Sequence, residues 1–137
     1  IEHEIVETCE RYGIGITPFS PLAQGLLTGK YRKGQPLPAG SRATWQADRQ
    51  INDLLTEENL DKVEELRKVA DGLGLAMPVL ALAWILRLPV ISSVIVGASK
   101  PSQLESNLAA SGVELPADAL AEIDRILGFR RFERHIG

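Results

Sequence analysis

The sequence predicts an α/β fold with parallel strands, and three observations lead to that prediction. Residues 91–98 form a short apolar run rich in β-branched side chains, which is typical of a parallel strand covered on both faces. Residues 14–19 have the composition of a second short strand. Helical patterns separate the two, and that alternation favours parallel pairing. Because two parallel strands cannot shield both of their faces, further strands must come from elsewhere.

The first part of the chain predicts one helix, one strand and a long loop. Residues 2–12 have an apolar side and a charged side, so we expect an amphipathic helix that Gly13 ends. The strand 14–19 ends soon after Pro18, because proline fits poorly inside a strand. Residues 20–55 contain several glycines and prolines and have no clear period, and such long loops are often functional.

The second part predicts four helices around the second strand. A helix over residues 56–73 starts at Thr56, whose hydroxyl can cap it, and a buried apolar helix follows over residues 79–86. Two amphipathic helices are expected over residues 101–110 and 116–127. On these last two helices the side chains expected to face inward are Leu104, Leu108, Leu120, Ile123 and Leu127.

Composition excludes several classes of protein. The chain has 137 residues, enough for one domain with a core, and a net charge of -3, so no nucleic-acid partner is expected. No apolar run is long enough to predict a membrane span. The single cysteine, Cys9, cannot form an internal disulfide, and we expect a cytoplasmic protein. With only two, distant histidines no metal site is expected.

The turn after the second strand has the features of a phosphate site. Gly97 permits a sharp turn or the close approach of a ligand, and Pro101 fits the first turn of a helix. The N–H groups and positive dipole end of that helix would point to where the strand ends. Three polar residues share one helix face through their spacing of four, namely Ser99, Gln103 and Asn107. The alternative is an ordinary amphipathic helix with a solvated face.

Two segments together carry a resemblance to a known family. They are SPLAQGLLTGKY at residues 20–31 and VGASKPSQL at residues 96–104, the latter followed by Asn107. In this order and at this distance they resemble the C-terminal half of an aldo-keto reductase. The branch is the one that contains bacterial reductases and the beta subunits of voltage-gated potassium channels. The resemblance covers almost the whole chain.

The resemblance implies a fold and a cofactor. The family folds as a (β/α)8 TIM barrel that binds NADP(H), and residues 1–137 would form the C-terminal portion of that single domain with its last two parallel strands. A whole barrel needs about 250 residues. This chain starts at Ile1, and its only methionine is Met77, so we expect it to be part of a longer protein. The loop at about 20–55 would cover the cofactor.

The resemblance also assigns the site residues. The cofactor would be bound by four groups of residues. They are a turn around the pyrophosphate, two cations above the phosphates, a second turn at the 2′-phosphate and two side chains of the helix that follows. These are Ser20, Pro21, Leu22, Ala23, Gln24 and Gly25, then Lys30 and Arg42, then Gly97, Ala98 and Ser99, and finally Gln103 and Asn107. Many relatives have arginine near position 103 and glutamate at position 106, where this chain has Gln103 and Ser106, so the preference for NADPH over NADH is open.

No catalytic residue is predicted in this chain. The family's aspartate, tyrosine, lysine and histidine lie in its N-terminal half, and Tyr12, Tyr31, His3 and His135 match none of them. One hypothesis is therefore a cofactor-binding part of an NADP(H)-dependent reductase of small aldehydes or ketones, inactive as the 137-residue chain alone. The other is a noncatalytic half-barrel that binds the missing barrel half or a second copy of itself through open strand edges.

Overall fold

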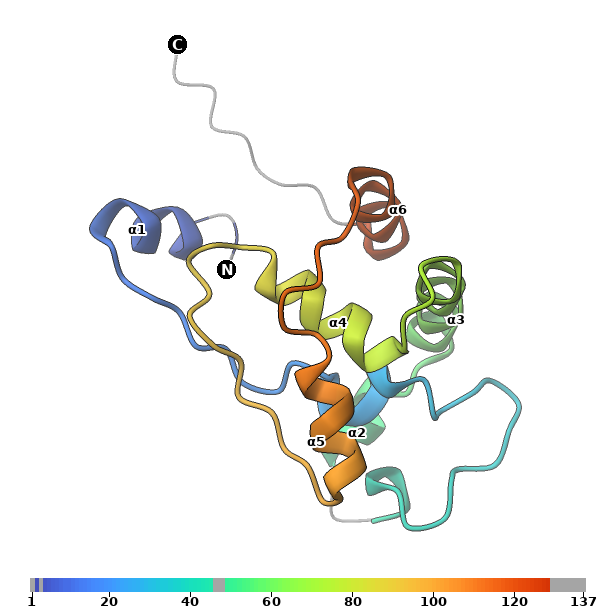
Figure 1. Cartoon of the computed structure of the whole chain (residues 1–137). Helices are drawn as coiled ribbons and strands as arrows, with labels where there is room; N and C mark the ends of the chain where they lie inside the picture. The colour runs from blue at the N-terminus through green and yellow to red at the C-terminus, as the bar shows by residue number, and fades with distance from the viewer. Residues whose placement is uncertain (1, 3, 46–48, 129–137) are drawn as a thin grey trace.

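The computed structural model describes residues 2, 4–45 and 49–128 (Figure 1). His3 and His135, which were not predicted to be catalytic, lie outside these residues. The helices, with η for 3-10 helices, are α1 (Ile5–Tyr12), η1 (Ala23–Thr28), η2 (Arg42–Thr44), α2 (Arg49–Leu54), α3 (Glu57–Gly72), α4 (Met77–Leu86), α5 (Pro101–Leu108) and α6 (Ala117–Leu127). Each helix expected from the sequence is present, although α1 begins later than predicted and α2, η1 and η2 interrupt the predicted loop.

The two expected strands lie side by side in parallel but do not form extended strands within the described residues. Isolated parallel bridges join Ile16 to Ile91 and Phe19 to Ile95. The Ser92 amide donates to the Ile16 carbonyl oxygen at 2.9 Å, and the Ile95 amide donates to the Pro18 carbonyl oxygen at 2.9 Å. The predicted parallel pairing is therefore present, while regular strands are not confirmed among the described residues. The physical reason is that each segment has only one described neighbour, and a proline cannot donate to a ladder.

The close approach of these two segments depends on Gly15. A Cβ atom at that position would lie 2.1 Å from the Ser92 hydroxyl oxygen, which no side chain tolerates without movement. The absent side chain therefore lets the segments pair at this point.

The ends of α1 and α3 follow the sequence signals. The Thr56 hydroxyl accepts from the Asn59 amide at 3.2 Å and caps α3. Gly13 follows α1 in the left-handed region with φ +64°, where glycine carries no steric penalty. Local sequence thus determines where α3 begins and where α1 ends.

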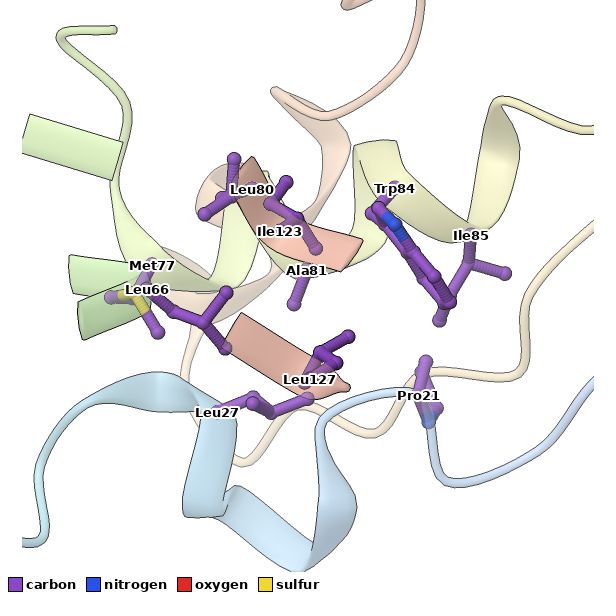
Figure 2. A pocket seen from close by; sticks show the side chains of 10 residues that line it. All are labelled: Pro21, Leu27, Leu66, Met77, Leu80, Ala81, Trp84, Ile85, Ile123 and Leu127. Atoms are coloured by element: carbon purple, nitrogen blue, oxygen red, sulfur yellow. The ribbon is translucent and has the colours of Figure 1, made fainter. Parts of the chain in front are cut away.

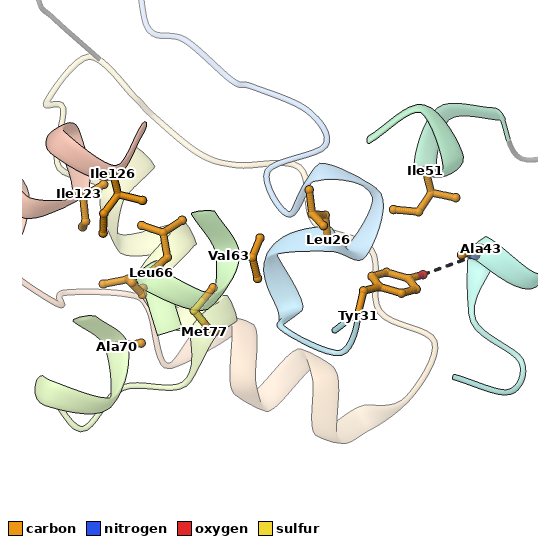
Figure 3. Close-up of a cluster of buried hydrophobic side chains, with 11 residues drawn as sticks. Leu26, Tyr31, Ala43, Ile51, Val63, Leu66, Ala70, Met77, Ile123 and Ile126 are labelled. Atoms are coloured by element: carbon orange, nitrogen blue, oxygen red, sulfur yellow. Dashed lines mark hydrogen bonds between the residues drawn. The ribbon is translucent and has the colours of Figure 1, made fainter. Parts of the chain in front are cut away.

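The main core lies between η1, α3, α4 and α6 (Figure 3). α3 packs on α6 and α4, and α4 also packs on η1 and α5. Its buried side chains are Leu26, Tyr31, Ala43, Ile51, Val63, Leu66, Ala70, Met77, Leu80, Ile123 and Ile126. The helix α4 contributes to this core and to a second cluster of Val79, Leu82 and Ala110, which agrees with its apolar sequence.

The inward faces of the last two helices differ from the prediction. Leu104 and Leu108 of α5 are 48% and 64% exposed, and Ala110, just after α5, is buried instead. In α6 the buried residues are Ala119, Ile123 and Ile126, so Ile123 was predicted correctly, while Leu120 is half-buried and Leu127 is exposed. α6 carries two apolar stripes one residue apart, and periodicity alone does not choose between them. The sequence of α5 offers the single pair Leu104 and Leu108, which no described element covers.

No single helix among the described residues has the length and apolar character to span a bilayer. α3 and α4 satisfy that test only as a pair, by length and composition, and they are bent by 89° where they meet.

Candidate functional site

The first predicted turn, residues 20–25, has an unusual backbone. Ser20, Ala23 and Gln24 have positive φ angles of 55°, 47° and 57°, and Gly25 follows with φ 100°. A left-handed conformation costs a non-glycine residue about 1–2 kcal/mol. Strain of this kind is found at functional sites, where the surrounding structure holds it. Sequence reasoning marked the turn but missed the strain, because no residue type other than Gly25 indicates it.

Polar side chains of this turn contact the predicted cation Arg42. The Gln24 amide nitrogen donates to the Ser20 hydroxyl oxygen at 2.9 Å. The Arg42 guanidinium in turn donates to the Gln24 amide oxygen. The structure therefore brings Ser20, Gln24 and Arg42 together, although Arg42 is 18 residues further along the chain. A guanidinium beside a strained turn is suited to binding an anion.

Tyr31 and Lys30 contact the segments that carry Arg42 and Gly25. Tyr31 is only 2% exposed, and its hydroxyl oxygen accepts from the Ala43 amide at 3.4 Å, as Figure 3 shows. This bond holds η2, and with it Arg42, against the core. The Lys30 ammonium lies 5.1 Å from the Tyr31 ring centroid and close to Gly25, where a Cβ atom would be 3.3 Å from it. The prediction that Tyr31 is a packing residue agrees with its burial, and its anchoring of η2 was not foreseen.

The remaining residues of the first turn face the protein. Leu22 is half-buried and packs against the cluster of Val79, Leu82 and Ala110. Pro21 is also half-buried and lines an apolar cavity together with side chains of η1, α3, α4 and α6. These two residues hold the turn in place, while polar contacts lie with Ser20 and Gln24.

The second predicted turn is exposed and polar. The Ser99 amide and hydroxyl both donate to the Gln103 amide oxygen, at 2.8 and 3.1 Å. Asn107 lies further along α5 and is half-buried. Gly97 and Ala98 are exposed, and a Cβ atom at Gly97 would meet nothing within 4 Å. Gly97 does not have a positive φ, so of its two predicted roles, a sharp turn or the close approach of a ligand, the open space around it leaves room for the second.

The two turns leave the same end of the parallel pair. Phe19 and Ile95 are bridged, Ser20 follows the first directly, and Ser99 follows the second after four residues. An extended chain rises about 3.5 Å per residue, so Ser99 lies within about 14 Å of Ile95. Arg42 contacts Gln24 and Lys30 lies near Gly25 in the first turn, and the exposed Lys100 directly follows Ser99 in the second. The arrangement offers hydrogen-bond donors and positive charge to a ligand with separated anionic groups.

The comparisons with known proteins agree on one family. A family model described as the aldo/keto reductase family matches residues 1–128. A putative voltage-gated potassium channel subunit beta from Schizosaccharomyces pombe is 39% identical over 96% of this chain and 39% of its own length. An L-glyceraldehyde 3-phosphate reductase from Escherichia coli is 37% identical over 88% of this chain and 36% of its own. The chain thus spans about two fifths of the curated relatives it matches.

A solved structure shows the same fold. The glycerol dehydrogenase from Gluconobacter oxydans superposes with a TM-score of 0.72 and is 24% identical, covering 99% of this chain and 39% of that protein. The predicted recognition from the two sequence segments is confirmed by these matches. The neighbour supports the predicted α/β barrel family, whereas the barrel strands themselves are not visible as strands among the described residues.

Proposed function

Because this chain belongs to the aldo/keto reductase family, we propose that it forms the cofactor-binding part of an NADP(H)-dependent reductase of small aldehydes or ketones. The chain would be the C-terminal portion of one barrel domain, with its two parallel segments as the last two strands. The observation that carries the proposal is the parallel bridge between Phe19 and Ile95, because it sends two polar turns out of the same end.

The residues of the first turn fit a pyrophosphate. Arg42 and Lys30 provide positive charge, and the Ser20 hydroxyl lies in the same hydrogen-bonded group as the Gln24 amide. In the present structure Arg42 and Gln24 satisfy each other, so a phosphate would replace the Gln24 oxygen as the acceptor for the guanidinium. Charge-assisted bonds to phosphate are stronger than the neutral bonds they replace. The segment at about 20–55 would then cover the cofactor through Arg42.

The second turn fits a 2′-phosphate less completely. The Ser99 amide and hydroxyl are donors, and the N-terminal end of α5 favours negative charge. Gln103, however, directs its amide oxygen toward Ser99, and an oxygen there repels a phosphate unless the side chain rotates. Lys100, exposed and next to Ser99, is the cation that would compensate.

An exposed apolar ring directly precedes the first turn. Phe19 is 80% exposed and directly precedes Ser20. Its phenyl ring would offer a face on which the nicotinamide ring could stack. Sequence reasoning treated Phe19 only as a strand residue and missed this role, which an exposed aromatic residue at a strand end would have suggested.

The chemistry would be shared with groups outside this chain. Bound NADPH supplies a hydride to the carbonyl carbon of the substrate, and this chain's residues would bind and orient the cofactor. The resemblance places the general acid and its partners in the N-terminal half of the family barrel. We therefore expect the purified 137-residue chain to give no turnover with NADPH and a simple aldehyde.

The first prediction tests cofactor binding. NADPH should bind the 137-residue chain, and Arg42→Ala should weaken binding about tenfold, because one charge-assisted bond to an exposed phosphate is lost. Isothermal titration at fixed salt measures both dissociation constants. Arg32→Ala is the matched control, since Arg32 is an exposed cation of the same segment outside the turn. Equal losses in the two variants, or no binding by a folded chain, would contradict the proposal.

A second candidate function is a noncatalytic assembly module. The specific observation is exposed apolar surface around the parallel pair: the bridged residues Phe19 and Ile95 are 80% and 57% exposed. A pair of segments with open edges offers unpaired backbone groups to another chain. The partner would then be a second copy of this chain. The oligomeric state of the chain in solution tests this function.

A further inference from the structure

One partly buried arginine of α3 contacts the backbone just after η1. The Arg67 guanidinium donates to the Gly29 carbonyl oxygen at 2.7 Å, although the two residues are 38 positions apart in the chain. The side chain of Arg67 is only 18% exposed, and its Nε donates to a carboxylate oxygen of Glu64 at 3.2 Å. Because a charged group that is mostly removed from water needs hydrogen-bond partners, breaking the contact with Gly29 would be costly.

Gly29 allows this contact through its lack of a side chain. It follows η1 in the left-handed region with φ +73°, and its amide donates to the Leu26 carbonyl oxygen at 3.2 Å. A Cβ atom at position 29 would lie 3.2 Å from an Arg67 guanidinium nitrogen and 3.3 Å from the Met77 Cγ atom. Carbonyl groups at a helix end have no partner within the helix, and a cation there is favourable. Arg67 therefore fixes the C-terminal end of η1 to α3.

Apolar packing brings the same elements together but fixes them less exactly. Leu27 of η1, Leu66 of α3 and Met77 of α4 line one apolar cavity (Figure 2). Apolar contact is not directional, whereas a hydrogen bond restricts both the distance and the direction of one backbone atom. The contact of Arg67 with Gly29 is therefore the one that sets the position of the backbone at this point.

The residues after Gly29 belong to the candidate cofactor site. A Cβ atom at Gly25 would lie 3.3 Å from the Lys30 ammonium, so Lys30 lies beside the first turn. The Tyr31 hydroxyl oxygen accepts from the Ala43 amide at 3.4 Å and so holds η2. Because Gly29 directly precedes both residues, a displacement of its carbonyl group would move the cation and the tyrosine with it.

We propose that Arg67 is a positioning residue of the cofactor site. By holding the Gly29 carbonyl group, it keeps the Lys30 ammonium beside the first turn, where a phosphate group of the cofactor would bind. Arg67 acts through these two residues and is not itself a group that binds the cofactor. The inference rests on the proposed function for the identity of the ligand, whereas the positioning is a property of the chain without ligand.

A second contact between the same parts of the chain provides a comparison. The Lys33 ammonium donates to both carboxylate oxygens of Asp61 in α3, at 3.0 and 2.9 Å. These two side chains are 49% and 58% exposed. Exposed ion pairs contribute little, because water competes for both charges. We therefore expect the position of this segment to depend on Arg67 and not on Lys33.

Amide hydrogen exchange tests the positioning without any ligand. Arg67→Met keeps an unbranched stem and removes the guanidinium. The amides of Gly29 and Ala43 should then exchange at least about threefold faster relative to the amides of α6, because the hydrogen bonds near the released carbonyl open more often. Lys33→Met is the control in the same segment and should leave this ratio unchanged. Comparison with α6 separates local opening from a loss of stability of the whole chain.

NADPH binding tests the step from Arg67 to Lys30. Isothermal titration at fixed salt should give a dissociation constant about three- to tenfold higher in Arg67→Met. In a chain that already carries Lys30→Met, the same substitution should change the constant less than about twofold, because the cation that Arg67 positions is gone. A residue that only stabilises the fold would weaken binding equally in both chains. Lys68→Met removes an exposed cation from α3 and should have little effect.

Two results would overturn the proposal. One is an unchanged exchange ratio in the folded Arg67→Met variant, and the other is an equal loss of NADPH affinity with and without Lys30. Failure of the folded, unsubstituted chain to bind NADPH would instead contradict the proposed function. The exchange measurement would still decide whether Arg67 positions the segment, so the two proposals fail separately.

Discussion

At the scale of single residues, the first turn combines strain with hydrogen bonding. Ser20, Ala23 and Gln24 each adopt a left-handed backbone conformation that their side chains disfavour. The bonds from Gln24 to Ser20 and from Arg42 to Gln24, together with burial of Leu22, oppose the strain. A turn held in this way is already arranged before a ligand binds, which reduces the entropy that binding would cost.

The residue that determines cofactor preference in our proposal is Gln103. Gln103→Arg should raise the ratio of NADPH to NADH affinity about tenfold or more, because a guanidinium forms charged hydrogen bonds with the 2′-phosphate that an amide cannot form. Dissociation constants for both cofactors at one salt concentration give the ratio. Gln35→Arg, which adds the same charge at an exposed loop position, should change the ratio little. A similar gain in both variants would show a general effect of charge instead.

At the scale of elements, the C-terminal end of α3 depends on two glycines with different roles. Gly72 is the last residue of α3, has no positive φ, and a Cβ atom there would meet nothing within 4 Å. Gly74 has equal space but a φ of +67°. The first position therefore tolerates a side chain, and the second requires the left-handed conformation that favours glycine.

This difference gives a matched pair of substitutions. Gly72→Ala should stabilise the chain by about 0.5–1 kcal/mol, because alanine loses less backbone entropy in a helix. Gly74→Ala should destabilise it by about 1–2 kcal/mol, because its Cβ clashes in the left-handed conformation. Urea unfolding measures both changes in the free energy of unfolding. Two changes of the same sign would show that backbone conformation does not control this helix end.

The contact between α6 and α3 includes an ion-pair network. Arg125 donates to Glu122 at 2.7 Å and to Glu65 of α3 at 2.9 Å. The hydrogen bonds from Arg125 hold the pKa of Glu122 below its usual value. A lowered pKa in the folded state means that folding favours the ionised carboxylate. Its contribution is therefore present above the ordinary pKa of glutamate and is lost as pH falls through the folded-state pKa.

This network predicts a pH dependence. Glu122→Gln should lower the melting temperature at pH 7, and the difference from the unchanged chain should shrink as pH falls through the lowered folded-state pKa of Glu122. The difference should also shrink at high salt, because these groups are exposed. Glu114→Gln, an exposed carboxylate outside the network, is the control. A difference that persists at low pH would show that packing, rather than charge, is responsible.

At the scale of the whole molecule, exposed apolar side chains predict association. Leu104 and Leu108 add to the exposed apolar surface of Phe19 and Ile95. The chain should sediment as a dimer or larger species, and Leu108→Glu should raise the dissociation constant at least about tenfold, since burying one leucine is worth about 1.5–3 kcal/mol. Sedimentation over a range of concentrations measures this, with Ala109→Glu as the control. A folded monomer at every concentration would exclude self-association.

Many elements of the fold could be predicted from short stretches of sequence. The Thr56 cap, the glycine after α1, the apolar helix α4 and the two motif segments are all features of short stretches of sequence. Leu127 could not be placed, because α6 offers two apolar stripes and only its neighbours decide which one is buried. Leu104 and Leu108 could not be placed, because only the tertiary structure shows whether another element covers their face. The regular strands are not confirmed for a similar reason: an isolated pair of extended segments is only marginally stable without further strands beside it.

The sequence by itself determined the family, the positions of the helices and the identity of the polar residues at the two turns, because these depend on residue types and local spacing. Only the tertiary structure decided that Arg42 contacts Gln24, that Ser20, Ala23 and Gln24 hold a strained backbone, and that Trp84 lines a cavity. These features depend on contacts between segments far apart in the chain, whose energies no local pattern contains.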